Sequence, residues 1–128
     1  MKFILFAVCL IGAVFAIEMD GGWSSISVDH PTVIQLAAKG VEHHNKIANN
    51  LYYKKLITIK EAKSQVVAGM NYEVKFLIGK TECVKSDANA ASCEVSANAI
   101  PELCTYVFWV RPGSDNAQIT QASCAPAK

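Results

Sequence analysis

Four of the five cysteines lie in the second half of the chain, and their spacing restricts how that half can fold. They are Cys83, Cys93, Cys104 and Cys124. No two of them show the C-x(2–4)-C spacing of a structural zinc site, so two disulfides are predicted and no metal. Cys104 and Cys124 lie at equal distances from Ser114, inside the turn-rich segment 112–116. If that segment turns an antiparallel hairpin, these two cysteines face each other at roughly 4.5–5.5 Å between Cα atoms, and Cys83 pairs with Cys93.

The first sixteen residues are typical of a secretory signal peptide. Lys2 precedes an apolar run at 3–16 that is too short to cross a bilayer as a stable helix. Cleavage is expected after the small residue Ala16, which removes Cys9 together with the signal. Residues 17–128 then form a single domain in a secreted, extracellular protein, where an oxidising environment favours disulfides.

Charge and cysteine usage exclude several classes of function. Without Lys2, the chain has eleven Lys and Arg against eleven Asp and Glu. Nucleic acids and anionic membranes attract clustered positive charge, so a neutral chain argues against both as partners. Paired cysteines also leave no thiol for nucleophilic catalysis, and no other catalytic set is visible. We therefore predict no enzyme activity, no cofactor and no metal.

Hydrophobic periodicity predicts one helix followed by several strands. The helix is expected at 31–50, with Pro31 in its first turn and Asp29 or His30 as the cap. Residues at helical spacing form its predicted inner stripe: Ile34, Ala37 or Ala38, Val41, Asn45, Ala48 and Leu51. Strands are predicted at 54–68, 72–78, 106–110 and 117–123. The expected fold class is α+β, with one long helix packed on a curved antiparallel sheet of about four to five strands.

The hairpin between the first two predicted strands has a tip of small apolar residues that ends in glycine. This segment consists of Gln65, Val66, Val67, Ala68 and Gly69. Short side chains and a flexible glycine let the backbone of such a tip approach a partner closely and enter a narrow cleft. An ordinary hairpin is the alternative interpretation of these five residues when they are taken alone.

This segment resembles the QxVxG signature of the cystatins, inhibitors of papain-like cysteine proteases. Gly21 and Gly22 precede it in an extended arm, one long helix follows the arm, and the four cysteines follow QVVAG. The order and approximate spacing of these features are similar to those of secreted type 2 cystatins over essentially all of 17–128. The resemblance therefore covers the whole predicted domain.

The resemblance implies a wedge of three elements that fills a protease cleft on both sides of the catalytic cysteine. These elements are the arm around Gly21, the QVVAG hairpin, and a second hairpin at Pro112 and Gly113. The expected function is reversible, tight-binding inhibition of papain-like cysteine proteases, with cathepsin L-type enzymes as the expected targets. A binding or structural module of the same fold that has lost inhibition is the alternative.

Two positions depart from the family pattern. Type 2 cystatins commonly carry Pro-Trp in the second hairpin, whereas Gly113 follows Pro112 here. Trp109 lies three residues earlier, within a predicted strand, and is not an obvious replacement. Losing an indole anchor of this kind is expected to cost about 2 kcal/mol of binding free energy. In the arm, Asp20 stands before Gly21 where the family usually has apolar residues, so narrowed specificity is expected because an apolar pocket would have to desolvate the carboxylate.

Several further residues have competing interpretations. Asn49 matches the key Asn with which some type 2 cystatins bind legumain-type proteases, although a cap or turn at the helix end is the alternative. His43 and His44 are adjacent, which is the wrong spacing for a metal site on a helix, so surface or packing roles are expected. Trp23 is interpreted either as cover for the core or as a protease contact. A monomer is expected, with exchange of the arm, helix and first strands between two copies as the alternative.

Overall fold

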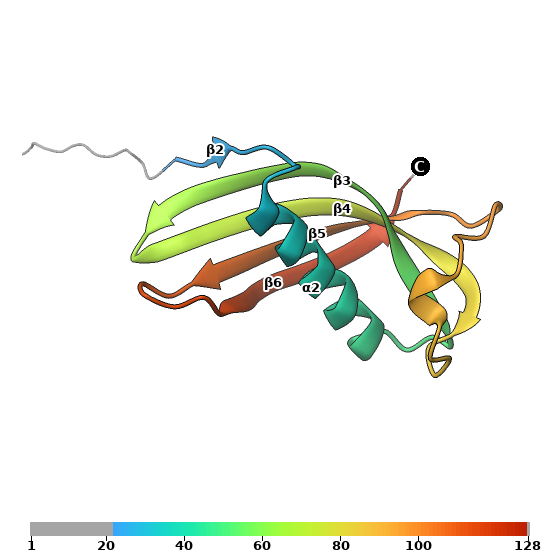
Figure 1. The fold of residues 1–128 in the computed structure, drawn as a ribbon. Coiled ribbons are helices and arrows are strands. Elements are labelled where there is room, and N and C mark those ends of the chain that lie inside the picture. Colours follow the sequence, from blue (N-terminus) through green and yellow to red (C-terminus); the bar gives the residue numbers. More distant parts are fainter. Residues whose placement is uncertain (1–21, 128) are drawn as a thin grey trace, which may run out of the picture.

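The computed structural model describes residues 22–127, in which one helix crosses one face of a five-stranded antiparallel sheet (Figure 1). The predicted signal peptide, Asp20 and Gly21 lie outside the described residues. The elements follow in the order β2 (Ser24–Ser25), α2 (Pro31–Ile47), β3 (Tyr52–Val67), β4 (Gly69–Val84), the short 3-10 turn η2 (Ala90–Ser92), β5 (Glu102–Val110) and β6 (Ala117–Pro126). The strand order in the sheet equals the order in the chain, from β2 to β6. The predicted α+β architecture is confirmed.

The start of α2 agrees with the sequence analysis, and its end does not. His30 is the N-cap, because its Nδ1 accepts a hydrogen bond from the backbone N–H of Thr32 at 3.1 Å. The helix ends at Ile47, three residues before the predicted end at position 50. Asn45 explains this difference, since its side chain accepts from the N–H of Lys54 at 2.9 Å and donates to the carbonyl of Lys54 at 2.8 Å. These two hydrogen bonds bring the returning chain back alongside the last turn of α2.

The buried face of α2 is rotated from the predicted stripe. Ile34, a predicted member of that stripe, is 49% exposed, whereas its neighbour Val33 is fully buried. Gly40 sets this orientation, because a Cβ atom there would lie 2.8 Å from Cζ of Phe76 in β4. The helix therefore approaches the sheet with its smallest residue against an aromatic ring. The core consists chiefly of Val33, Leu36, Ala37 and Val41 from α2, Val74, Phe76 and Ile78 from β4, and Cys104, Tyr106 and Phe108 from β5.

Both predicted disulfides are present. Cys104 and Cys124 are direct register partners across β5 and β6, with 4.0 Å between their Cα atoms. Cys83 and Cys93 close the loop after β4 with a Cα separation of 6.4 Å. The strands around them are longer than the hydrophobic alternation indicates, and both β3 and β4 contain sixteen residues. None of the helices in residues 22–127 has the length and apolar character of a membrane span.

Candidate functional site

Two β-turns lie at the same end of the sheet, and they touch one another (Figure 1). The first turn joins β3 to β4 through Ala68, with Val67 and Gly69 as register partners. The second joins β5 to β6 and contains Pro112. A Cβ atom added to Gly69 would lie 2.1 Å from the carbonyl oxygen of Val110 and 3.0 Å from Cδ of Pro112. Gly69 is therefore the point at which the backbones of the two hairpins pack together, and its φ of +92° also favours glycine.

A row of side chains supports the first turn from the sheet. Gln65, Asn71 and Trp109 are successive register partners across β3, β4 and β5. Asn71 Nδ2 donates a 3.0 Å hydrogen bond to Gln65 Oε1. Trp109 Nε1 donates to the carbonyl oxygen of Ala68 at 2.8 Å, so an indole of β5 reaches the tip of the β3–β4 hairpin. Gln65 and Gly69 therefore have structural roles within the QVVAG segment.

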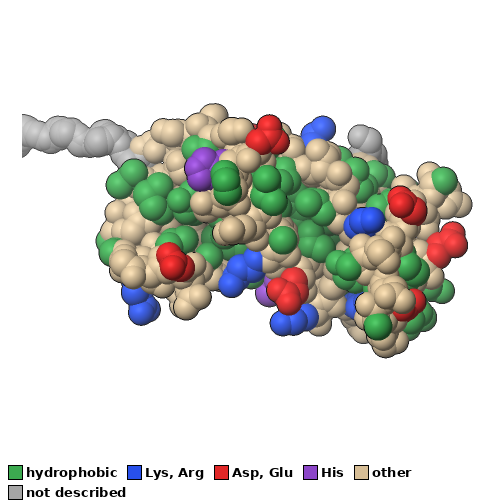
Figure 2. All heavy atoms as spheres, in the orientation of Figure 1, with side chains coloured by type: hydrophobic (Ala, Val, Ile, Leu, Met, Phe, Trp, Pro, Cys, Tyr) green, Lys and Arg blue, Asp and Glu red, His purple; other side chains and the backbone are tan. Residues whose placement is uncertain are grey.

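The middle of QVVAG is presented to solvent. Val66 is 76% exposed and Val67 is 41% exposed, although both are apolar. Ala68 is exposed as well. In Figure 2, hydrophobic side chains reach the surface at the end of the molecule that carries the two turns in Figure 1. Apolar side chains held outward on a supported turn are suited to entering a cleft in a partner.

The second turn presents a smaller surface. Pro112 and Gly113 are both exposed, and a Cβ atom at Gly113 would have no neighbour within 4 Å. The φ of Gly113 is +75°, which L-residues rarely adopt. Trp109 lies inside β5 and not at this turn, as expected. Its contact with Ala68 was not predicted, because no local pattern links residues so far apart in the sequence.

The N-terminal segment runs along the outer edge of β3 toward the first turn. Ser24 and Ser25 of β2 are register partners of Ser64 and Lys63. Because the pairing is antiparallel, Ser24 lies nearer to the β3–β4 turn than Ser25 does. Trp23 is 40% exposed on this path. The predicted contact residue Gly21 lies outside the described residues.

Asn49 does not join this group of residues. It is exposed in the connection between α2 and β3, at the opposite end of the sheet from the two turns. The same connection is anchored by Lys85, whose Nζ donates to the carbonyl of Ala48 at 2.7 Å. Any partner of Asn49 would therefore approach a different surface from a partner of Val66 and Val67.

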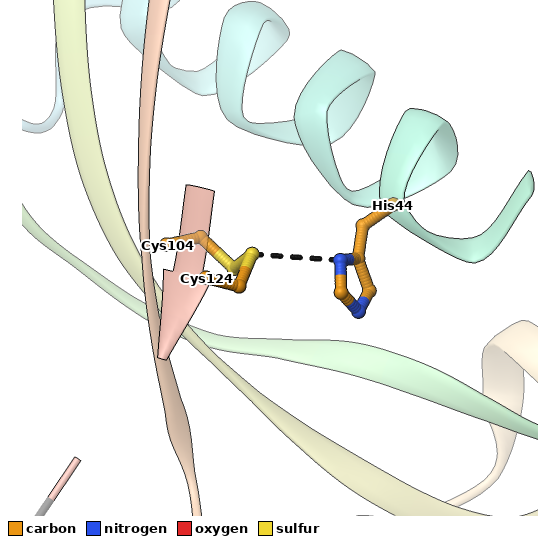
Figure 3. Close-up of side chains that lie close together, drawn as sticks. All are labelled: His44, Cys104 and Cys124. Carbon is orange, nitrogen blue, oxygen red and sulfur yellow. Dashed lines mark hydrogen bonds between the residues drawn. A yellow bond between two sulfur atoms is a disulfide. The ribbon is translucent and has the colours of Figure 1, made fainter. Parts of the chain in front are cut away.

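The two histidines have packing roles. His43 Nδ1 is hydrogen-bonded to the Tyr106 hydroxyl at 2.9 Å. Figure 3 shows His44 beside the Cys104–Cys124 disulfide, with 3.4 Å between His44 Nδ1 and Cys124 Sγ. A disulfide sulfur can only accept a hydrogen bond, so Nδ1 carries the proton. The sulfur atoms of Cys104 and Cys124 are bonded to one another and supply no thiolate. They therefore cannot bind a metal ion together with His44.

Burial determines the charge state of His44. Desolvation lowers the pKa of its imidazole below the usual value of 6.5, and the nearby Lys54 ammonium lowers it further. Glu102 acts in the opposite direction, but its carboxylate oxygen is 3.8 Å from His44 Nε2, too far for a hydrogen bond. His44 is consequently neutral at pH 7 and not the cationic half of an ion pair. The carboxylate of Glu102 is paired instead with Lys54, at 2.5 Å.

The family model described as "Cystatin domain" matches residues 21–113. This match covers more than half of the chain, which therefore belongs to the cystatin family. Cystatin-1 of Chilobrachys guangxiensis is 32% identical over 97% of this chain and 95% of its own length. L-cystatin of Tachypleus tridentatus is 33% identical over 84% of this chain and 83% of its own length.

The fold of this chain is also similar to those of solved structures. The crystal structure of Al-CPI is 34% identical, with a TM-score of 0.77, and matches 84% of this chain and 100% of that one. Dimeric human cystatin F is 24% identical, with a TM-score of 0.71 over 94% and 98% of the two chains, and is similar in fold. Cystatins are inhibitors of cysteine proteases and not enzymes, and the two disulfides fit the type 2 branch of the family. Family and fold thus support cysteine protease inhibition as the general function.

Proposed function

We propose that the end of the sheet carrying the two turns inhibits papain-like cysteine proteases by occupying their active-site cleft. Val66 and Val67 of the first hairpin enter the cleft beside the catalytic cysteine, and Pro112 and Gly113 of the second hairpin cover its other side. The arm around Gly21 occupies the substrate-side pockets. The inhibitor supplies no catalytic group and places no bond for cleavage.

The single observation that carries this proposal is the contact between the two hairpins at Gly69. Because a Cβ atom there would overlap the carbonyl oxygen of Val110, the two turns form one continuous edge. The exposed apolar side chains of Val66 and Val67 lie on this edge. An edge whose backbone is already ordered loses little conformational entropy when it binds, which favours high affinity.

Two further elements belong to the proposal. The antiparallel pairing of β2 with β3 places Ser24 nearer to the first turn than Ser25, which supports a contribution to binding from the arm around Gly21. Secretion after cleavage at Ala16 would bring residues 17–128 to extracellular or endosomal proteases, cathepsin L-type enzymes among them. Secretion also agrees with the two disulfides.

Titration of papain and of a cathepsin L-type enzyme with residues 17–128 tests the proposal. We expect stoichiometric loss of peptidase activity. Val67→Asp should weaken inhibition by at least about 100-fold, because the new carboxylate must be desolvated in the cleft. Ile100→Asp is the matched control, since Ile100 is 72% exposed at the other end of the sheet, and it should inhibit like the wild type.

Absence of inhibition at micromolar protein would reject the proposal and favour a binding module of the same fold. Equal inhibition by wild type and Val67→Asp would show that the enzyme contacts another surface. Loss of inhibition in Ile100→Asp alone would place the contact at the opposite end.

A second candidate function is inhibition of legumain-type asparaginyl proteases through Asn49. Its exposure in a connection anchored by Lys85 favours this role over that of a buried cap. Asn49→Ala is expected to abolish inhibition of a legumain-type enzyme and leave papain inhibition unchanged. Unchanged inhibition of the legumain-type enzyme, or none by the wild type, would reject the role.

A further inference from the structure

We propose that Trp109 is a positioning residue, which holds the β3–β4 turn in its binding conformation through the hydrogen bond from its indole N–H to Ala68. This inference rests on the proposed function, in which that turn enters the protease cleft. Trp109 itself does not need to touch the enzyme.

The peptide between Ala68 and Gly69 makes two contacts with the end of the neighbouring β5–β6 hairpin. The carbonyl oxygen of Ala68 accepts the hydrogen bond from Trp109 Nε1 at 2.8 Å. Gly69 packs against the carbonyl oxygen of Val110 and the ring of Pro112. One contact is a side-chain hydrogen bond and the other is close backbone packing, and together they restrain the orientation of this peptide plane.

The turn benefits from this support because the side chain at its first exposed position packs poorly. Val66 is 76% exposed and therefore packs against little of the protein. A hairpin tip without packed side chains normally fluctuates, since local order follows buried contacts. Gln65 is hydrogen-bonded to Asn71 on the strand side, which orders the base of the hairpin. The indole N–H of Trp109 adds a hydrogen bond at the tip itself.

Arg111 covers the indole. Its guanidinium carbon is 5.8 Å from the centre of the Trp109 ring, within the range of a cation–π contact. This contact favours one orientation of the ring and so directs Nε1 toward Ala68. The second hairpin thereby contributes to the order of the first, although Gly113 gives it no large anchor of its own.

Two replacements of Trp109 test the inference. Trp109→Phe removes the donor and part of the ring. Substitution of Trp109 by benzothienylalanine, in which sulfur replaces the indole N–H, removes only the donor and keeps the size of the ring. Tyr52→Phe is the matched control, because it removes a polar hydrogen from an aromatic residue at the far end of the sheet.

Two quantities are measured for each protein: the dissociation constant for papain, and the 15N order parameters of Ala68 and Gly69 in the free protein. Both Trp109 replacements should lower these order parameters from about 0.85 toward 0.6. They should also weaken papain binding about fivefold, the effect expected for one neutral hydrogen bond. Tyr52→Phe should change neither quantity.

Unchanged order parameters in both Trp109 replacements would overturn the inference. Weaker papain binding in Trp109→Phe but not in the benzothienylalanine protein would overturn it too, by assigning the effect to the ring and not to the N–H. If the wild type fails to inhibit papain, the proposed function is rejected. The order parameters then decide the role of Trp109 alone.

Discussion

The two ends of the sheet both expose large apolar side chains but are held together differently. At the hairpin end, the exposed residues are Val66 and Val67, and at the opposite end Leu51 and Ile100 are 62% and 72% exposed. Exposure therefore does not distinguish a binding edge from ordinary surface. The opposite end is closed by the Cys83–Cys93 disulfide, whereas in the described chain the hairpin end has no covalent link.

Close backbone packing and a side-chain hydrogen bond order the hairpin end. Gly69 fits against Val110 and Pro112, and Trp109 binds the carbonyl of Ala68. Two kinds of substitution should therefore have different effects. Changes away from the hairpin end should lower the free energy of unfolding and leave protease affinity intact, whereas changes at the two turns should lower affinity.

Removal of the Cys104–Cys124 disulfide should have the largest effect on stability. Replacement of both cysteines by alanine is expected to lower the free energy of unfolding by about 3 kcal/mol, because the reduced chain loses the constraint on its unfolded state. Urea denaturation measures this loss. The bridge lies six residues from Val110 along β5, so the papain dissociation constant should stay within about twofold. A parallel loss of affinity in the folded variant would contradict the separation of the two ends.

Gly69→Ala should weaken papain binding by about 100-fold, or 2 to 3 kcal/mol. The added Cβ atom would lie 2.1 Å from the carbonyl of Val110, so the two hairpins must move apart. Inhibition of papain measures the change. Gly113→Ala is the matched control, because this glycine also has a positive φ but has no neighbour within 4 Å of the added atom. Equal effects of the two substitutions would show that backbone conformation, and not hairpin contact, determines affinity.

Gly113→Trp should tighten papain inhibition modestly. An indole at the second turn is expected to add about 2 kcal/mol of binding free energy. The φ of +75° at this position opposes that gain by about 1 kcal/mol for a residue with a side chain. The net expectation is about fivefold tighter inhibition, with Gly113→Ala as a control for backbone strain alone. An unchanged inhibition constant would indicate that the second hairpin does not contact the enzyme.

Acidification should lower stability slightly through His44. Burial and Lys54 lower the pKa of this imidazole in the folded protein, so the unfolded chain takes up the proton first as the pH falls. The stabilising contribution is complete above about pH 6.5 and is lost as the pH falls through the lowered pKa of the folded state. Lys85 and His43 also lower this pKa, and Glu102 raises it.

Urea denaturation of wild type and His44→Gln between pH 8 and pH 5 measures this contribution. The free energy of unfolding of the wild type should fall more steeply with acidification than that of the variant. Identical slopes would show that His44 titrates alike in both states. Papain affinity should change little, because His44 lies on α2 beside the Cys104–Cys124 disulfide and away from the turns.

The features that could be predicted from sequence are those that depend on local patterns. Alternating residues around Phe76 and Tyr106 indicate their strands, and the equal distances of Cys104 and Cys124 from Ser114 indicate both the hairpin and its disulfide. The QVVAG segment identifies the first turn. Each of these signals is contained in a short stretch of chain, where side-chain period or turn chemistry determines the outcome.

The features that could not be predicted depend on contacts between distant residues. Val33 is buried and Ile34 is exposed because Gly40 fits against Phe76. The spacing of apolar residues along the helix does not reveal this contact with the sheet. The contact from Trp109 to Ala68 likewise joins β5 to the β3–β4 turn. Spacing and composition do not report such contacts, because they arise only when the sheet register is set.

The central claim is that the hairpin end, and not the disulfide end, occupies the protease cleft. Mapping 15N–1H chemical shift changes on addition of papain with a blocked catalytic cysteine, and again with a free one, tests it most directly. When the catalytic cysteine of papain is free, the amide signals of Val66 to Gly69 and of Arg111 and Gly113 are predicted to shift or broaden. Signals around Tyr52 and Ile100 should stay in place. Changes centred on Tyr52 and Ile100, with the two turns unaffected, would contradict the account.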